Sequence, residues 1–336
     1  MGRRLGLGGL TAAVCLVLTV AAACGSSGGS SGSGASPSGA GGTLVVFGAG
    51  TLSAPFAEEI AAFKKQNPGV TVHSQFAASG DMVKKITQLH QPADVLGVAD
   101  YSLIPKLMFT GSKPFATWYV GFVSNEITFA YTSDSKGAGQ LTASNWYKVL
   151  AQPGVRIGRS NPAADPSGYQ TLQMLQLANG YYHQPGLSDS VLKNSPAASV
   201  AETETSLISA LQSGQIDYLA IYKSTAQEEQ LKYIPLPPQI NLSDPAMAAD
   251  YAKVTIQAGS LGSLTAKPII YGLTVPATAP NAALGEKFIH FVLSPAGQAI
   301  MRSNGFVIIS PALASSQDKV PASLQPLTKQ WPSSGG

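Results

Sequence analysis

Residues 159–172, Arg-Ser-Asn-Pro-Ala-Ala-Asp-Pro-Ser-Gly-Tyr-Gln-Thr-Leu, are the stretch around which the chain is organised. An apolar run at 155–158 indicates a strand before it, and apolar residues at 172, 175 and 178 predict a helix after it. A strand-to-helix turn aims several backbone N–H groups at one point, where the helix dipole adds positive charge. The one carboxylate of this turn, Asp165, therefore stands where an anion is expected. Either it caps the helix or it coordinates a bound ligand.

The first 42 residues predict export and tethering instead of a folded domain. Residues 1–23 carry Arg3 and Arg4 before an apolar run that ends in small residues, which is typical of a signal peptide. Cys24 follows directly, so we expect lipidation there, with ordinary cleavage beside an incidental cysteine as the alternative. Residues 24–42 are rich in Gly and Ser and predict a flexible tether. Because the only other cysteine, Cys15, lies inside the signal peptide, no disulfide is expected.

From residue 43 onward, strand patterns alternate with helix patterns. Apolar strands are predicted at 44–47, 70–76 and 93–98, and the first two are each followed by a helix pattern. Such a succession argues for a parallel sheet covered on both faces, whose ligands bind beyond the carboxyl ends of the strands.

The whole pattern predicts an α/β protein of two lobes with a ligand cleft between them. Lobe one is expected from residues 43–124 and 254–330, and lobe two from residues 125–253. After removal of the signal peptide, 19 basic residues face 18 acidic ones, and no run of Lys or Arg exceeds two residues. This balance argues against nucleic acid as a partner.

Motifs for catalysis remain incomplete. The turn Gly48-Ala49-Gly50-Thr51-Leu52-Ser53 lacks the third glycine of a dinucleotide fingerprint, and Asp165-Pro166-Ser167-Gly168 lacks the first glycine of a nucleophile elbow. The four histidines, at 73, 90, 183 and 290, have no metal-ligand spacing. We therefore expect neither catalysis nor a cofactor, and a two-lobed enzyme acting in the cleft is the less favoured alternative.

Small hydroxyl residues stand at the predicted strand ends. Thr51 and Ser79 follow the first and second strands, and each is either a helix N-cap or part of a shared anion cradle. Tyr222 ends a strand predicted at 217–222, where it is either a phenol donor or a packed core tyrosine. Short hydroxyls with backbone amides suit a small oxyanion better than a sugar or peptide.

Eight motifs, in order, resemble the tungstate/molybdate-binding proteins of ABC importers, in their archaeal-type branch. They occupy residues 46–52, 92–95, 99–108, 145–147, 158–162, 165–169, 213–218 and 221–224, and the resemblance extends from residue 43 to residue 311. It implies a type II periplasmic-binding-protein fold whose lobes close over tungstate or molybdate. The resemblance also implies an ABC permease as partner. With a lipid on Cys24, we expect a monomeric, lipid-anchored protein on the extracytoplasmic face of the cell membrane.

The resemblance also implies a ligand set in which two carboxylates join four oxo groups around the metal. By position, the carboxylates fall on Asp165 and Glu204, with Glu202 as the alternative to Glu204. The other contacts fall on the hydroxyl or amide groups of Thr51, Ser79 and Ser167 and on the phenol of Tyr222. A carboxylate that bonds to the metal centre of tungstate or molybdate acts as a ligand of that metal. Sulfate and phosphate cannot expand their shells to accept such a bond, so the same carboxylate would repel them. A binder of one of those other tetrahedral oxyanions is the main alternative.

Overall fold

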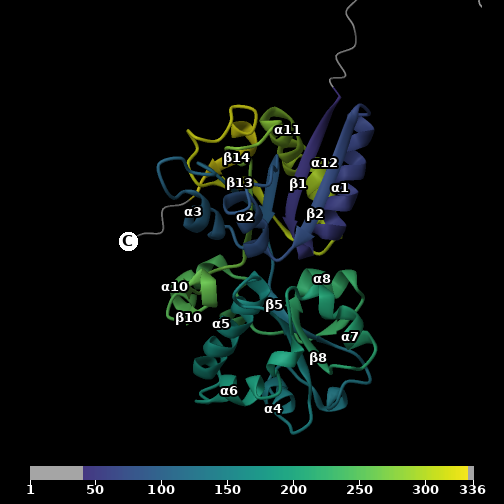
Figure 1. Ribbon diagram of the computed structural model, residues 1–336. Coiled ribbons are helices and arrows are strands. Elements are labelled where there is room, and N and C mark those ends of the chain that lie inside the picture. Colours follow the sequence, from purple (N-terminus) through teal and green to yellow (C-terminus); the bar gives the residue numbers. More distant parts are fainter. Residues whose placement is uncertain (1–40, 332–336) are drawn as a thin grey trace, which may run out of the picture. The chain divides into compact units, whose positions relative to one another are not determined.

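The computed structural model describes residues 41–331, and its strands divide between two sheets and a small hairpin. A seven-stranded sheet has the order β14-β13-β4-β12-β3-β1-β2, and a five-stranded sheet has the order β7-β6-β8-β5-β9. We call each sheet with its helices a lobe, lobe one for the seven-stranded sheet and lobe two for the five-stranded sheet. Figure 1 shows the course of the chain through both. Within residues 41–331, no helix is long and apolar enough to cross a membrane.

Lobe one is built from the beginning and the end of the chain. Its strands are β1 (Gly42–Ala49), β2 (Val70–Ala77), β3 (Val95–Val98), β4 (Val120–Ser124), β12 (Ile270–Thr274), β13 (Val307–Ala314) and β14 (Thr328–Gln330). Its helices are α1 (Ser53–Gln66), α2 (Ser79–Thr87), α3 (Leu103–Met108), α11 (Ala282–Leu293) and α12 (Pro295–Ser303). Both faces are covered, because Val46 packs in the core under α1 and α11 while the next residue, Phe47, packs with α2.

Lobe two lies between β4 and β12 in the sequence. Its strands are β5 (Ile127–Tyr131), β6 (Ile157–Ser160), β7 (Val200–Ala201), β8 (Tyr218–Tyr222) and β9 (Lys232–Tyr233). Its helices are α4 (Trp146–Leu150), α5 (Pro166–Tyr181), α6 (Leu187–Leu192), α7 (Ile208–Gln212) and α8 (Lys223–Glu228). The return to lobe one carries α9 (Pro238–Asn241), α10 (Ala248–Tyr251) and the hairpin of β10 (Thr255–Gln257) and β11 (Ser263–Thr265).

Short 3-10 helices join these elements. They are η1 (Gly50–Leu52), η2 (Ala138–Gln140), η3 (Ala197–Ser199), η4 (Thr205–Leu207), η5 (Pro245–Met247), η6 (Gly259–Leu261) and η7 (Gln325–Leu327). Two of them adjoin predicted site residues: Thr51 lies within η1, and Glu204 directly precedes η4.

The predicted parallel start of the first sheet is confirmed, but the whole sheet is mixed. Strand β1 pairs in parallel with β2 and β3, whereas β12 runs antiparallel to both β3 and β4. The reason is the excursion into lobe two: the chain leaves through β4 and returns through the neighbouring β12, in the opposite direction. The predicted lobe boundaries stay a prediction, and the predicted signal peptide and Cys24 lie outside the described residues.

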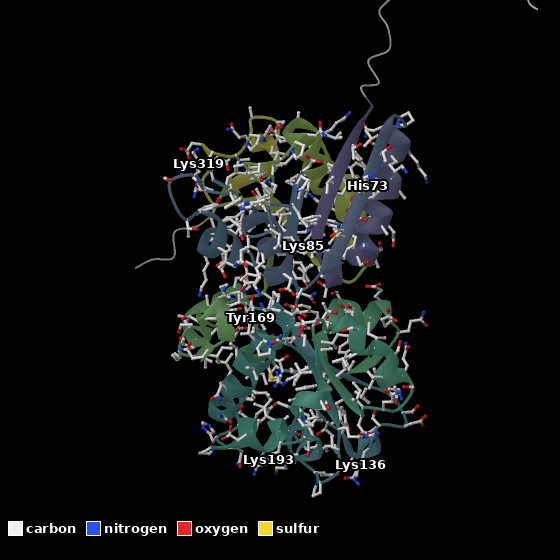
Figure 2. The ribbon with its side chains drawn as sticks, viewed as in Figure 1. His73, Lys85, Lys136, Tyr169, Lys193 and Lys319 are labelled. Carbon is white, nitrogen blue, oxygen red and sulfur yellow. The ribbon has the colours of Figure 1, made fainter. Side chains whose placement is uncertain are left out.

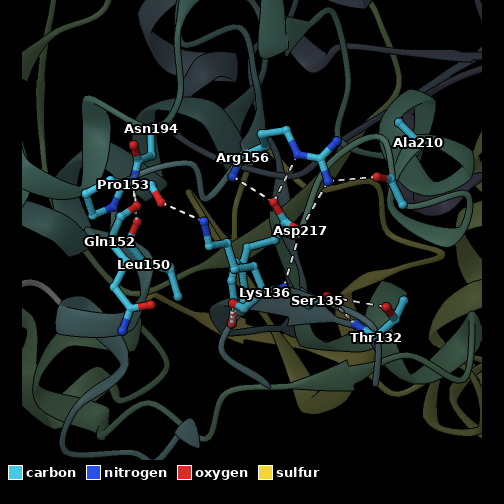
Figure 3. Close-up of polar contacts among 12 residues, drawn as sticks. Thr132, Ser135, Lys136, Leu150, Gln152, Pro153, Arg156, Asn194, Ala210 and Asp217 are labelled. Atoms are coloured by element: carbon cyan, nitrogen blue, oxygen red, sulfur yellow. Dashed lines mark hydrogen bonds and ion pairs between the residues drawn. The ribbon is translucent and has the colours of Figure 1, made fainter. Parts of the chain in front are cut away.

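A charged network fixes the amino ends of β6 and β8, as Figure 3 shows. The Arg156 guanidinium donates to both oxygens of Asp217, at 3.1 and 3.2 Å, and the Lys136 amide donates to the same carboxylate at 3.3 Å. Arg156 and Asp217 immediately precede their parallel strands. The opposite, carboxyl ends of these strands are therefore the edge left for ligand binding.

One buried carboxylate of lobe one makes stability depend on pH. Glu59 lies on α1 between Phe56 and Phe63, is fully buried, and has no hydrogen-bond partner for either carboxylate oxygen among the described residues. Burial, and next the charge of Glu58, raise the pKa of Glu59 to about 8. The folded state therefore holds a proton that the unfolded chain releases, and this stabilisation is lost as the pH rises through 8.

We expect the unfolding free energy to fall by about 2 kcal/mol between pH 6 and pH 8 through Glu59 alone. Glu59→Gln removes the titration, so its unfolding free energy, measured by urea denaturation, should exceed that of the wild type more at pH 8 than at pH 6. Replacing the exposed Glu202 with Gln is the matched control. Equal pH dependence in wild type and Glu59→Gln would contradict the prediction.

Candidate functional site

The turn between β6 and α5 places Asp165 at the N-cap position of α5. Its backbone is extended, with φ −117° and ψ 130°, and Pro166 begins the helix with a φ suited to that place. The Asp165 side chain makes no capping hydrogen bond, although it occupies the capping position. It accepts instead from the Ser167 hydroxyl at 3.2 Å, and that hydroxyl also lies 2.5 Å from the Ser160 hydroxyl. The helix start therefore leaves the carboxylate without a capping hydrogen bond.

Gly168 allows this turn to be so tight. A Cβ atom at this position would lie 2.5 Å from the Ser160 carbonyl oxygen and 2.8 Å from the Asn161 carbonyl carbon. Because both neighbours are backbone atoms, only glycine lets the first turn of α5 approach the end of β6 this closely. The close approach brings Asp165 and Ser167 to the carboxyl edge of the sheet.

Glu204 is the second carboxylate of the site, at the loop that precedes η4. It is fully buried, and its Oε1 accepts from the Tyr222 amide at 3.2 Å and from the Thr225 hydroxyl at 3.1 Å. Its Oε2 has no hydrogen-bond partner among the described residues. The alternative residue, Glu202, is exposed two positions earlier. The geometry therefore favours Glu204 over Glu202 as a partner of Asp165.

The two carboxylates act on each other's protonation. Burial, and next the negative charge of Asp165, raise the pKa of Glu204 to about 8. Burial raises the pKa of Asp165 to about 6, although hydrogen bonds from the Ser160 and Ser167 hydroxyls act in the opposite direction. A buried pair of this kind disfavours the doubly charged state unless an electron-pair acceptor lies between them. Such an acceptor could bond to Oε2 of Glu204, which has no hydrogen-bond partner among the described residues.

Thr51 and Ser79 lie on the lobe-one side, at equivalent ends of neighbouring strands. Ala49 pairs with Ala77 at the carboxyl ends of β1 and β2, and Thr51 and Ser79 each follow two residues later. Neither residue occupies an N-cap position, because Ala49 precedes η1 and Ala78 precedes α2. The Ser79 hydroxyl accepts from the Ala99 amide at 3.1 Å, which leaves its own proton for another acceptor.

Tyr222 ends β8 with a fully buried side chain. Its hydroxyl donates to the Gln170 side-chain oxygen at 2.5 Å, so in this structure its phenol proton is already used within lobe two. Its backbone amide donates to Glu204 Oε1. Burial is the main cause that raises the pKa of Tyr222 well above its usual range, and the charges of Glu204 and Asp165 add to it. Tyr222 is thus beside the carboxylate pair.

Sequence reasoning missed Tyr271 and Asn125. Tyr271, on β12, lies with its hydroxyl 3.0 Å from the Thr51 hydroxyl and accepts from the Asn125 side-chain amide at 3.4 Å. Burial, and next the charge of Glu204, raise its pKa well above the ordinary value. Asn125 also donates to the Ser224 hydroxyl of lobe two at 2.6 Å. A tyrosine in a fully buried apolar strand was the available signal, because its hydroxyl needs a partner.

The structure therefore brings the six predicted residues into one neighbourhood. Ser167, Glu204 and Tyr222 contact or electrostatically influence Asp165. Thr51 joins them through Tyr271, and Ser79 through its neighbour Gly80, whose amide donates to the Ala164 carbonyl at 2.9 Å. A cleft of about 360 Å³ is lined by Thr51 alone of the six, together with Thr205 and Thr225, which lie beside Glu204. Which of these residues touch a ligand stays a prediction.

Two lobes with polar groups gathered at facing strand ends are the architecture of a solute-binding protein. The bacterial extracellular solute-binding protein family matches residues 44–307 of this chain, and the chain belongs to that family. It is 37% identical to the molybdate/tungstate-binding protein WtpA of Thermococcus kodakarensis, over 93% of this chain and 94% of the relative. It is 39% identical to a solute-binding protein of Petrotoga mobilis, over 86% of this chain and 90% of the relative.

Solved structures confirm the predicted fold. The periplasmic molybdate-binding protein of Azotobacter vinelandii matches with a TM-score of 0.59 and 20% identity, covering 79% of this chain and 99% of that chain. The sulfate-binding protein SubI of Mycobacterium tuberculosis matches with a TM-score of 0.54 and 14% identity, covering 84% and 89%. This chain has the type II periplasmic-binding-protein fold, which structures of different ligand specificity share.

Proposed function

We propose that this protein captures tungstate or molybdate outside the cytoplasm, holds it between the two lobes and delivers it to an ABC permease. The names of the WtpA relatives support this ligand class, and the family supports the location. Glu204 is the observation that carries the proposal: a fully buried carboxylate whose second oxygen has no partner, next to the buried Asp165. Such a pair is costly for the protein alone.

The chemistry of the ligand accounts for the carboxylates. A dianion facing two carboxylates is repelled in a buried site unless their oxygens bond to its metal centre. In our proposal, Asp165 and Glu204 each donate one oxygen to the hexavalent metal, and the four oxo groups complete a six-coordinate shell. Hard oxygen donors suit a hard, high-valent centre. The central atoms of sulfate and phosphate cannot expand their coordination shells in this way, so these anions are only repelled by the two carboxylates. Asp165 and Glu204 would therefore also select the ligand.

The remaining polar groups would bind the oxo atoms. The hydroxyls of Thr51 and Ser79 come from lobe one, and the Ser167 amide comes from the first turn of α5. The Tyr222 phenol would join them by exchanging its bond to Gln170 for one to the ligand. Because these donors come from both lobes, binding favours the arrangement in which the lobes are in contact, and a permease can recognise that arrangement.

Attachment to the membrane completes the proposal. A lipid on Cys24, followed by the tether at 24–42, would hold the two lobes close to the permease on the extracytoplasmic face. In this role the protein acts as a monomer without catalysis.

Calorimetry tests the proposed ligand. The full chain is expected to bind tungstate and molybdate with submicromolar dissociation constants, and to give no binding heat with sulfate or phosphate. X-ray absorption on the tungstate complex should count six ligands around the metal. Sulfate binding as strong as that of tungstate would contradict the proposal, and a four-coordinate metal would show that the carboxylates are not ligands.

A further inference from the structure

Another buried carboxylate, Asp100, lies outside the proposed ligand set, at the lobe-one sheet edge that also carries Thr51 and Ser79. It follows β3 by two residues, as Thr51 follows β1 and Ser79 follows β2. Its Oδ1 accepts from the Ser102 amide at 2.9 Å. Its Oδ2 accepts from the Tyr169 hydroxyl at 2.7 Å and forms an ion pair with Lys267 at 3.0 Å.

Asp100 differs from Asp165 and Glu204 because both of its carboxylate oxygens have hydrogen-bond or ion-pair partners. Burial acts to raise the pKa of Asp100, but the charge of Lys267 and the hydrogen bonds from Tyr169 and Ser102 lower it overall below its usual range. The group therefore stays charged at neutral pH. A charged acceptor makes the bond from Tyr169 stronger than one to a neutral oxygen.

Tyr169 of lobe two joins the Asp100 carboxylate of lobe one to the helix that begins after Asp165. It lies on α5, four residues and about one helical turn after Asp165, and its fully buried ring is labelled in Figure 2. It packs with Leu103 of lobe one and with Leu261 and Leu264 of the returning segment, so its hydroxyl bond is kept from water.

The turn is held on its other side as well. The Ala164 carbonyl, directly before Asp165, accepts from the Gly80 amide of lobe one at 2.9 Å. Gly80 is in the first turn of α2, where N–H groups have no partner within the helix. Lobe one therefore anchors the turn on both sides of Asp165, through Gly80 before it and through Asp100 after it.

We propose that Asp100, paired with Lys267, is a positioning residue that latches Tyr169 and thereby holds the Asp165 turn against lobe one when the lobes are in contact. The part of this proposal that concerns ligand release rests on the proposed function. The latch does not touch the ligand. It slows release by stabilising the arrangement in which groups of both lobes surround the ligand, and it leaves the first encounter with the open cleft unchanged.

Tyr169→Phe tests the latch, since it removes only the hydroxyl. We expect tungstate to dissociate at least about tenfold faster from the full-length variant, with an unchanged association rate, in stopped-flow measurements. In the ligand-free protein, hydrogen exchange of the Gly80 amide, followed by NMR, should become faster by a similar factor, because that amide is protected only while the lobes touch. Asp100→Asn keeps an oxygen acceptor without the charge and should increase both rates less.

Tyr218→Phe is the matched control. Its hydroxyl donates to the Lys136 carbonyl at 2.8 Å, at the opposite end of lobe two, so this variant should leave both rates unchanged. If Gly80 exchange in Tyr169→Phe equals that of the wild type, or changes equally in Tyr218→Phe, the latch is wrong. If the wild type binds no tungstate, the proposed function fails, while Gly80 exchange in the ligand-free protein still decides the latch.

Discussion

Asp165→Ala is expected to weaken tungstate binding by a factor of about a hundred to a few thousand. Removing one partner from a buried charged contact typically costs about 3–5 kcal/mol, which corresponds to that range of affinity. The substitution removes one of two proposed protein ligands and leaves Glu204 alone with the dianion. Titration calorimetry with the full chain measures the change.

The direction of the change separates three roles of Asp165. A metal ligand gives a large loss, a carboxylate that only repels anions gives a gain in affinity, and a residue that serves the helix start alone gives no change in binding. Ser79→Ala removes one hydroxyl donor and should weaken binding by only about tenfold. Asp189→Ala, at an exposed position on α6, is the matched control and should bind as the wild type does.

Local sequence rules indicate the residues of the predicted site that stand at strand-to-helix turns. Parallel strands that end at one edge predict Thr51 and Ser79, and the register of Ala49 with Ala77 confirms that both lie at equivalent strand ends. Asp165 was identified because a Gly- and Pro-rich turn joins a strand to a helix. In each of these cases, the residues that decide the geometry are neighbours in the chain.

The rest of the site depends on contacts between distant segments. Tyr271 meets Thr51 across 220 positions, and Asn125 meets Ser224 across 99, so no local pattern carries these pairs. The location of Glu204 came from a family resemblance, because an acid before a short helix usually lies in solvent. Its burial depends on the amide of Tyr222 and the hydroxyl of Thr225, which only the fold brings to it.

The antiparallel strands of the lobe-one sheet also depend on segments that are distant in the sequence. The pattern of β1, β2 and β3 predicts parallel pairing, and the pairing is parallel. Strands β4 and β12 are separated by the whole of lobe two, and their antiparallel pairing follows from the path of the chain out and back. Neither strand carries that information in its own residues.

Gly80→Ala is expected to disfavour closure of the lobes and to weaken tungstate binding by roughly ten- to a hundredfold. A Cβ atom on Gly80 would lie 2.7 Å from the Ala164 carbonyl oxygen, which is closer than nonbonded carbon and oxygen atoms approach. That oxygen belongs to the backbone and cannot turn aside, so the two lobes must separate or the turn must shift. Overpacking of this kind costs about 1–3 kcal/mol, and here the cost falls on the closed arrangement alone.

Gly180→Ala is the matched control because a Cβ atom there meets nothing within 4 Å. It lies near the end of α5, so alanine should leave tungstate affinity unchanged and stabilise the fold by about 0.5–1 kcal/mol. Gly80→Ala should lose affinity without a matching loss of thermal stability, since the open lobes keep their own cores. Wild-type affinity in Gly80→Ala would mean that the ligand-bound protein does not use the contact between Gly80 and Ala164, and that the Asp165 turn reaches the ligand from a different position of the lobes.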